Sequence, residues 1–374
     1  MNGFNAVESN VCGNGVATIS ETVLENVRTL VKLRLRSDCE IKLISEGVLK
    51  GQSGDKVYHV MRKNTIELLA VAKIFHKKDT FENECKAIEI LKSLKEAQKL
   101  GASTHIENLA TFPLESCFLM LQSPAAGKGL DDYLEYYFKT KKSKSDEFIG
   151  LMKATARAFA ELHRNTISSQ RACIDLYVNK IRSLLGEIPE VRKKFEEECS
   201  YLSSKDCSER INRLITRAEK DRRLGSIIHG DGHPGNIFAN FQEGRWVITW
   251  IDTDSLYLTT NGNELKGHAP PERDYSYFLV HLRNIYLRSM LELAEGVDIH
   301  PKYHLLKCTF KKEYEMNQHH VVKSHKDLQA VRGLLASIIR SFKRPIMLGS
   351  HEFNHEWKIR QLTILKLEKI VKKY

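Results

Sequence analysis

The chain has 374 residues, of which 42% are hydrophobic and 28% are charged, with a formal net charge of +11. These proportions are typical of a globular protein, and a single core rarely organises a chain of this length, so we expect two lobes or domains. The first 15 residues lack the basic and apolar regions of a signal peptide, and no apolar run is long enough to span a membrane. We therefore expect a soluble, cytoplasmic protein without a transmembrane segment.

The charge is unevenly spread along the chain. Residues 301–374 hold 16 Lys and Arg against 6 Asp and Glu, so the first 300 residues are close to neutral. Eight cysteines are scattered without a C-x-x-C pair, which is typical of reduced core thiols and not of a disulfide framework or a zinc site.

The first predicted element is a helix. Thr18 and Glu21 have the spacing of a capping box, and Val27 and Val31 follow at a helical interval. We expect this helix within an N-terminal segment, residues 1–40, that precedes the first lobe.

Residues 41–75 change to a strand pattern that glycines interrupt. Backbone N–H groups at a glycine-bearing turn are able to approach phosphates closely. We therefore predict that Gly51, Ser53 and Gly54 bind the phosphates of a cofactor, although their spacing fits a plain hairpin turn equally well.

The next predicted strand, residues 68–75, is apolar except for Lys73. An ammonium group is costly to bury without an opposite charge. The following helix begins near Asp79, and Glu84 lies on its apolar stripe and not on its solvated face. We interpret Lys73 and Glu84 as a buried pair that holds the lysine for nucleotide phosphates. The alternative is a surface glutamate with a lysine whose stem alone is buried.

Further strands and helices follow along the chain. An apolar strand covers residues 118–122 and ends before Pro124, and a helix is expected to start after Gly129. A second helix runs over residues 151–163, and residues 165–225 are charged and helical in pattern. These helices form most of the second half of the molecule.

The chemistry of the chain is concentrated at residues 228–236 and 250–254. An apolar lead-in places Asp231 on a tight loop, Asn236 follows before a short strand, and a second strand delivers Asp252 to the same end of the hairpin. A phosphate-bound Mg²⁺ prefers a few hard oxygen ligands, and a hydroxyl that attacks ATP needs a carboxylate to orient it. We predict that Asp231 is the base and that Asn236 and Asp252 bind the metal. A polar turn between two core strands would not explain these offsets.

The same stretch resembles the aminoglycoside phosphotransferase and choline kinase group, whose signature is H-G-D-x-H-x-x-N followed by I-D. The matching residues are His229, Gly230, Asp231, His233, Asn236, Ile251 and Asp252. The D-x4-N spacing is also that of the protein-kinase catalytic loop. The match places His229 with Asp231 among the expected catalytic residues.

This resemblance implies an α+β, bilobal protein-kinase-like fold. The small β-sheet N-lobe would cover residues 41–123, and the larger, mostly helical C-lobe residues 124–374, with nucleotide in the cleft between them. Met120 and Gln122 would then lie on the segment that grips adenine. Asp274 looks like the family residue that supports the active-site loop, although a plain carboxylate at a helix N-terminus is equally consistent.

Position 232 departs from the family pattern. Gly232 stands where the family usually has Leu or another apolar residue. We expect this glycine to loosen the catalytic loop and to affect the turnover rate more than the class of reaction.

We therefore expect an ATP- and Mg²⁺-dependent phosphotransferase that acts on a hydroxyl of a small molecule. A protein or lipid kinase of the same fold is one alternative, and a catalytically weak binding protein that uses its basic tail is another. The last alternative is disfavoured because the residues expected to do the chemistry are all present: Lys73, Glu84, Asp231, Asn236 and Asp252. The near-neutral body of the chain gives no support for a polycationic aminoglycoside as the acceptor.

The basic tail is predicted to end in an amphipathic helix. Its apolar stripe would consist of Ile359, Leu362, Leu365, Ile370 and Val371. Its cationic remainder would consist of Lys358, Arg360, Lys366, Lys369, Lys372 and Lys373. Such a helix either packs its stripe on the large lobe with its lysines in water, or meets an anionic partner such as a membrane, a nucleic acid or a phosphate-rich acceptor.

Overall fold

A computed structural model describes most of the chain from residue 25 onward. It does not describe residues 1–24, 26, 30, 34–38, 44–55, 102, 115–116, 141–144, 170, 195–199, 257–268, 294–297, 319–320 and 344–349. Gly51, Ser53 and Gly54 lie outside the described residues, so their binding of phosphates stays a prediction.

Contacts within the chain group it into two compact units. The first unit is Met1–His76 with Leu109–Gln122, and the second is Lys77–Asn108 with Ser123–Tyr374. This division is based on contacts and does not test the predicted domains, residues 1–40, 41–123 and 124–374, which stay a prediction.

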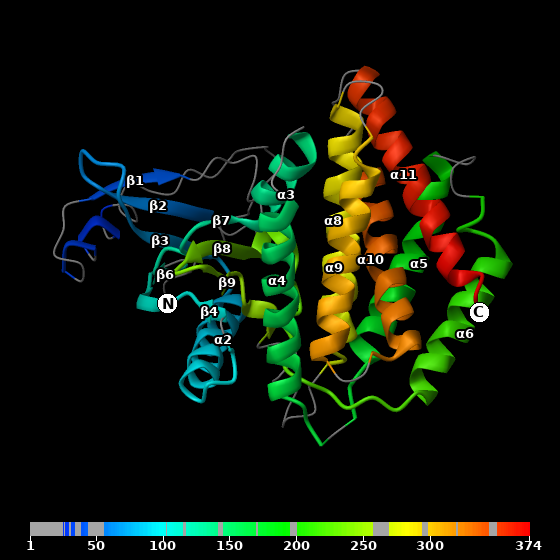
Figure 1. The fold of residues 1–374 in the computed structure, drawn as a ribbon, viewed down its shortest axis with the longest axis horizontal. Coiled ribbons are helices and arrows are strands. Elements are labelled where there is room, and N and C mark those ends of the chain that lie inside the picture. The colour runs from blue at the N-terminus through cyan, green and yellow to red at the C-terminus, as the bar shows by residue number, and fades with distance from the viewer. Residues whose placement is uncertain are drawn as a thin grey trace, which may run out of the picture. The chain divides into compact units, whose positions relative to one another are not determined.

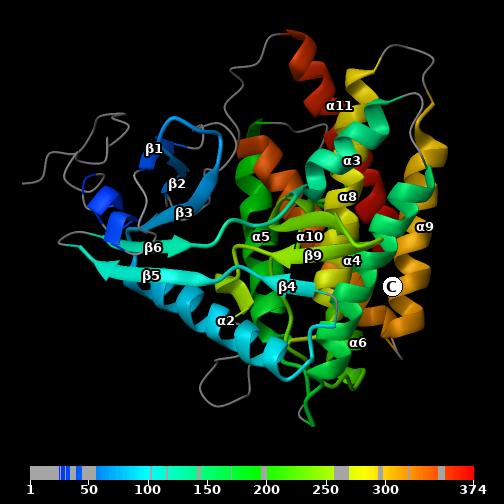
Figure 2. The same cartoon turned by 60° about the vertical axis from the view of Figure 1, so that its left-hand side comes forward.

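The first unit is built on a five-stranded sheet (Figure 2). In sheet order its strands are β1 (Cys39–Leu43), β2 (Lys56–Arg62), β3 (Leu68–Phe75), β6 (Phe118–Gln122) and β5 (Asn108–Pro113). The pairs from β1 to β6 are antiparallel. Val27 and Val31, in the helical stretch that the capping box predicted, pack with the buried side chains of β2, β3 and β6. This core fixes the strand that carries Lys73.

The second unit contains a smaller sheet that ends at the predicted chemistry. In sheet order its strands are β4 (Ser103–His105), β9 (Arg245–Trp250), β8 (Ile237–Gln242) and β7 (Lys128–Gly129). Strands β8 and β9 form the predicted hairpin, and its two-residue turn has positive φ at both Glu243 (50°) and Gly244 (77°). These angles match a type I′ turn, whose twist fits that of the flanking strands.

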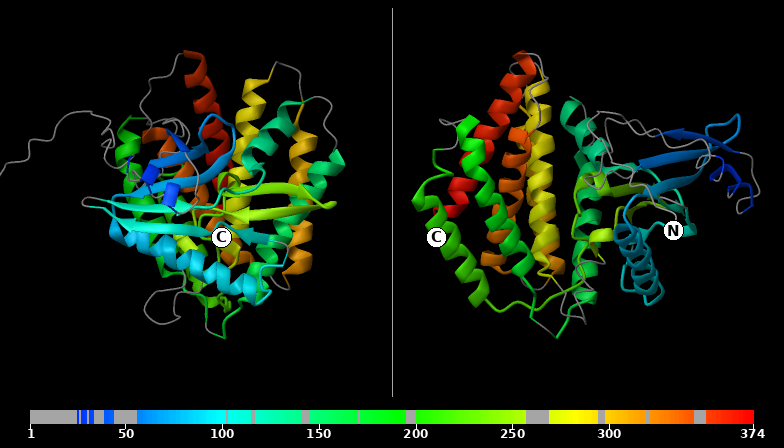
Figure 3. Two further views of the ribbon diagram at one scale, coloured as in Figure 1. Left: turned by 90° about the vertical axis from the view of Figure 1, so that its left-hand side faces the viewer. Right: turned by 180° about the vertical axis from the view of Figure 1, so that it is seen from behind.

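Helices make up most of the second unit (Figures 1 and 3). They are α2 (Lys78–Glu96), α3 (Leu130–Lys139), α4 (Ser145–Asn165), α5 (Asp175–Lys194), α6 (Lys205–Lys220), α8 (Glu272–Glu292), α9 (His300–Asn317), α10 (Lys323–Lys343) and α11 (Ser350–Val371), with a 3-10 turn η1 at Pro234–Asn236. Helix α10 packs against α5, α8 and α11, while α4 packs against α9. None of the helices in the described part of the chain is long and apolar enough to cross a membrane.

The C-terminal helix α11 packs on α10, α6 and α8, and its burial differs in part from the predicted stripe. Leu367, Ile370 and Val371 are buried, whereas Leu365 is 57% exposed. Arg360, which we assigned to the cationic face, is buried with its guanidinium 4.1 Å from the centroid of the Phe342 ring. The sequence assignment was wrong for Arg360 because an arginine stem and a guanidinium plane are able to pack on apolar and aromatic surfaces.

This packing predicts opposite effects for two leucines of α11. Leu367→Ala should lower the free energy of unfolding by about 2–5 kcal/mol, because Leu367 is fully buried in the core of α10 and α11. Leu365→Ala should change it by less than about 0.5 kcal/mol, because Leu365 faces solvent. Urea denaturation followed by circular dichroism measures both. Equal destabilisation by the two substitutions would contradict the packing of this helix.

Candidate active site

The Asp274 carboxylate, in the first turn of α8, holds the loop that carries Asp231. Its Oδ2 accepts a hydrogen bond from the His229 backbone N–H at 2.6 Å, and its Oδ1 accepts one from the Gly230 N–H at 2.9 Å. His163 of α4 adds a contact of 3.0 Å between its Nε2 and the same Oδ2, and both side chains are fully buried. The resemblance implied this support of the loop, and the geometry provides it.

The charge of Asp274 is maintained by these partners. Burial alone would raise the pKa of Asp274, but the hydrogen bond from His163, electrostatic attraction to the His163 and His229 side chains, and the His229 N–H together hold that pKa below its usual value. The second nitrogen of His163, Nδ1, lies 2.8 Å from the Tyr314 hydroxyl. His163 is thus a packed and fully bonded core residue.

The His229 side chain connects the loop to the end of β9. Its Nε2 donates to the Ile251 carbonyl at 3.0 Å, and its ring centroid lies 5.5 Å from that of Trp250. Because a carbonyl oxygen can only accept a hydrogen bond, Nε2 carries the hydrogen in this contact. The His229 side chain therefore has a structural contact. A direct catalytic role for His229 stays a prediction.

Asp231, Asn236 and Asp252 lie close together at the end of the hairpin. The Asn236 Nδ2 donates to the Asp231 carbonyl at 3.0 Å and to the Asp231 Oδ2 at 3.2 Å. The Ile251 N–H donates to the Asn236 carbonyl at 3.2 Å, which brings the next residue, Asp252, beside it. Asp252 adopts a left-handed backbone conformation with φ of 50°. The side chain of Asp231 remains 38% exposed, so an acceptor is able to reach it.

The donor set at this end of the hairpin fits a magnesium ion. Both hydrogen bonds that the Asn236 side chain makes with described residues use Nδ2, which leaves its Oδ1 as a hard oxygen donor, and Asp252 supplies a carboxylate one residue beyond Ile251. No group of three or more His, Cys, Asp or Glu side chains in the described part of the chain forms a metal cage. Mg²⁺ needs no such cage, because it usually binds one or two protein ligands together with substrate phosphates and water.

Two glycines shape the loop. Gly230 has a φ of 82°, and a Cβ atom built there would lie 2.9 Å from the Cβ of Ser255. A Cβ at Gly232 would lie 2.7 Å from the ring of Phe159, which is fully buried and packs on Trp250. The space beside Gly232 is therefore filled by Phe159. That Gly232 loosens the loop stays a prediction.

The predicted nucleotide residues lie on strands and a helix that are individually well packed. Lys73 on β3 stands opposite Met120 on β6 in the strand register, and Gln122 donates to the Met120 sulfur at 3.0 Å. Lys73 is 8% exposed, and Glu84, on α2 of the second unit, is fully buried. The sequence predicted that both side chains would be buried, while their pairing and their contact with a nucleotide stay predictions.

Sequence reasoning missed a group of side chains beside Asp231. Arg273, Tyr277 and His281 follow one another at intervals of four along α8, and such spacing places them on one helix face. The ring centroid of His281 lies 4.9 Å from that of His233 and 4.5 Å from that of Tyr277. The charge of Asp231 and a hydrogen bond to it add to burial in raising the pKa of Tyr277. The four-residue spacing was visible in the sequence, but its nearness to the loop was not.

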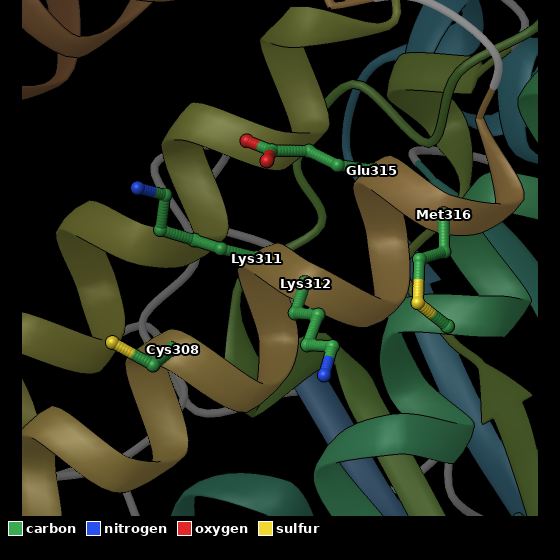
Figure 4. A pocket seen from close by; sticks show the side chains of 5 residues that line it. All are labelled: Cys308, Lys311, Lys312, Glu315 and Met316. Atoms are coloured by element: carbon green, nitrogen blue, oxygen red, sulfur yellow. The ribbon is translucent and has the colours of Figure 1, made fainter.

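A surface pocket on α9 is lined by other residues than those of the candidate site. Cys308, Lys311, Lys312, Glu315 and Met316 line it, and Figure 4 shows all five side chains leaving one helix. None of the residues predicted to bind nucleotide, metal or acceptor contributes to its lining.

The anchoring of the loop gives a prediction for Asp274→Asn. The amide can accept a hydrogen bond at one position only, so either the His229 N–H or the Gly230 N–H faces a donor, and the free energy of unfolding should fall by at least about 1–3 kcal/mol. The pKa of Asp274 is lower in the fold than its unfolded value of about 4, so its contribution to stability is complete above that value and is lost as the pH falls through the folded pKa.

Urea denaturation of the wild type and of Asp274→Asn over a pH series measures this effect. The difference in unfolding free energy should narrow as the pH falls below about 4. A difference that is absent at neutral pH, or that widens in acid, would contradict the role of Asp274 as a buried, ionised anchor.

The packing at Gly232 gives a second prediction. Gly232→Leu should destabilise the protein by about 1–3 kcal/mol, because the new side chain overlaps the Phe159 ring. Phe159→Leu should itself destabilise by leaving a cavity, but the double variant should be more stable than the sum of the two single effects predicts. A double-mutant cycle by denaturation tests this, and strict additivity would show that the two positions do not share one space.

Comparison with known proteins shows the fold. Scans against protein-family models and against curated protein sequences find no match. Among solved structures, a glucosamine kinase in complex with glucosamine, ADP and inorganic phosphate aligns with a TM-score of 0.56 and 14% identity, over 91% of this chain and 82% of that one. The kinase domain of Mycobacterium tuberculosis PknI, a double mutant, aligns over 79% of this chain and 94% of that one, with 10% identity and a TM-score of only 0.31. The chain has the kinase-like α+β fold that its sequence predicted, with a small antiparallel sheet and a larger helical part.

Proposed function

We propose that the protein is an ATP- and Mg²⁺-dependent phosphotransferase that acts on a hydroxyl of a small molecule. The observation that carries this proposal is the grouping of Asp231, Asn236 and Asp252 at one end of the β8–β9 hairpin, on a loop held by the buried Asp274. The fold shared with a glucosamine kinase supports this class of reaction. Within the fold, the H-G-D-x-H-x-x-N motif favours the aminoglycoside phosphotransferase and choline kinase group.

In the proposed reaction Asp231 orients the acceptor hydroxyl and receives its proton. The acceptor oxygen forms a new bond to the γ-phosphorus as the bond from that phosphorus to the β–γ bridging oxygen breaks, and ADP leaves. The Asn236 Nδ2 donates to the Asp231 Oδ2 and so holds the carboxylate in position. A bound Mg²⁺, with Asn236 and Asp252 as its proposed ligands, would neutralise charge on the phosphates.

The nucleotide phosphates are proposed to meet Lys73, with Glu84 as the partner that holds the lysine. Met120 and Gln122 are proposed to lie beside the adenine, and the glycine-bearing turn beside the phosphates. Lys73 and Glu84 are each buried, and a buried ammonium and a buried carboxylate are both costly without opposite charges.

Two alternatives differ from this proposal in measurable ways. A protein or lipid kinase would use the same residues on a larger acceptor. A catalytically weak protein would instead rely on an anionic partner at the basic tail. In that tail Arg360, Lys372 and Lys373 contact Phe342, Glu368 and Asp327 respectively. These contacts support the interpretation of α11 as a packed structural helix.

Substitution of Asp231 separates catalysis from binding. Asp231→Asn should lower turnover by about 10²–10⁴-fold, because a general base contributes to the transition state, while ATP affinity stays nearly unchanged. Asp252→Ala should weaken ATP binding only when Mg²⁺ is present. Production of ADP over a panel of sugars, amino alcohols, inositides and proteins measures turnover, and calorimetry with ATP, with and without Mg²⁺, measures binding.

Asp146→Asn is the matched control, since it removes the same charge from the exposed first turn of α4. It should behave as the wild type does in both assays. Full activity of Asp231→Asn would exclude Asp231 as the base. Absence of any heat with ATP in either condition would overturn the proposed function as a whole.

A further inference from the structure

Two arginines near the proposed base form no ion pair with a carboxylate in the described part of the chain. Arg273, in the first turn of α8, is 3% exposed, and its Cζ lies 3.9 Å from the centroid of the Tyr277 ring. Its Nη1 finds no hydrogen-bond partner among the described residues. A buried guanidinium N–H without a partner is costly, so its presence calls for a reason.

Arg332 belongs to α10, which packs on α8, and its charge interacts with that of Arg273. Its Cζ lies 5.4 Å from the centroid of the Tyr177 ring, and its Nε and Nη1 have no partner in the described part of the chain. The charges of Arg273 and Arg332 both act on the Tyr177 phenol. Arg332 is also near enough to Asp231 for the two charges to interact. The two guanidiniums and the proposed base therefore form one neighbourhood, built from α5, α8, α10 and the loop.

The other carboxylates close to Arg273 in sequence are already engaged. The Glu272 Oε1 forms an ion pair with the Arg223 Nε at 3.1 Å and accepts a hydrogen bond from the Val322 N–H at 2.9 Å. Asp274 accepts hydrogen bonds from the His229 and Gly230 N–H groups and contacts His163. The charge of Asp231 acts on Arg332, and Asp231 is the group that must turn toward the acceptor.

Other titratable groups surround the loop, and the carboxylates of Asp131 and Asp252 both act on His233. Burial is the main reason why the pKa of His281 lies well below its usual value. Arg340, about two turns beyond Arg332 on α10, adds a further positive charge that acts on His281 and Tyr277. Arg273, Arg332 and Arg340 therefore give the α8 and α10 side of this neighbourhood a positive field, although the main body of the chain is close to neutral.

We propose that the acceptor carries an oxyanion, a carboxylate or a phosphate, in addition to the hydroxyl that is phosphorylated. Arg332, which is only partly buried, contacts this oxyanion, and Arg273 behind it strengthens the positive field. The planar guanidinium matches a carboxylate or phosphate through paired hydrogen bonds, which are stronger than those to a neutral group. A cationic acceptor would be repelled from the same position. This inference rests on the proposed phosphotransferase function and narrows its substrate class.

Acceptor sets with one carbon skeleton and different charge test the proposal. The first set is glycerol, glycerate, glycerol phosphate and aminopropanediol, and the second is glucose, glucuronate, glucose phosphate and glucosamine. Each set holds a neutral, a carboxylate, a phosphate and an ammonium member. We expect higher kcat/KM for the oxyanionic members of at least one set, and the carboxylate and phosphate members distinguish the two sources of negative charge.

Substitutions at Arg332 connect this preference to the site. Arg332→Gln should lower the ratio of kcat/KM for the oxyanionic over the neutral member by about 10- to 100-fold, the effect of one lost charged contact. Arg332→Lys keeps a point charge without the paired geometry and should lie between Arg332→Gln and the wild type. Arg213→Gln is the matched control, because it removes an exposed arginine from α6, and it should keep the wild-type ratio.

Calorimetry without nucleotide separates this proposal from the proposed function. Glucuronate and glycerol phosphate should bind the wild type and Arg213→Gln, and more weakly Arg332→Gln, even if no turnover occurs. Such Arg332-dependent binding together with an absence of ATP binding would reject the kinase and retain the oxyanion site. Preference for the neutral or ammonium members, a ratio unchanged in Arg332→Gln, or an absence of any Arg332-dependent binding or turnover would overturn the proposal.

Discussion

The buried Asp274 carboxylate is the contact on which the candidate site depends. Two consecutive backbone N–H groups and one imidazole converge on it, and hydrogen bonds to an ionised acceptor are roughly twice as strong as neutral ones. They hold the chain at Gly230, where φ is positive and the loop turns toward Asp231. Since Asp274 belongs to α8, the loop and that helix are positioned together, and the side chains one and two turns further along α8 come to lie beside Asp231.

The parts of the site that the sequence predicted are those governed by local rules. A two-residue turn that contains Gly244 sets the hairpin register, and the register sets Asp252 beside Asn236. The burial of Glu84 followed from the apolar positions at helical spacing around it. In each case neighbours within a few residues determined the outcome, so the pattern in the sequence was sufficient.

The parts that the sequence did not predict depend on packing between distant elements. Arg332 is one of many basic residues in the C-terminal third of the chain, and nothing in its own neighbours distinguishes it from a solvated lysine or arginine. It meets Tyr177 only because α10 packs on both α5 and α8. Arg360 was misassigned for a related reason, since its burial is decided by the aromatic ring of another helix. The exchange of volume between Gly232 and Phe159 likewise needs the packing of α4 on the loop.

The left-handed backbone of Asp252 has a thermodynamic consequence. An L-residue with a φ of 50° is strained relative to glycine, and the penalty of such conformations is on the order of 1–2 kcal/mol, although aspartate tolerates them better than most residues. Folding stability alone would favour glycine or asparagine at this position, as it does at ordinary turns. Glu243 has the same φ in the hairpin turn, so the backbone conformation alone does not mark a functional residue; at Asp252 the strained position is also the one proposed to bind the metal. The fold stores a small amount of free energy at the point where its chemistry is proposed to occur.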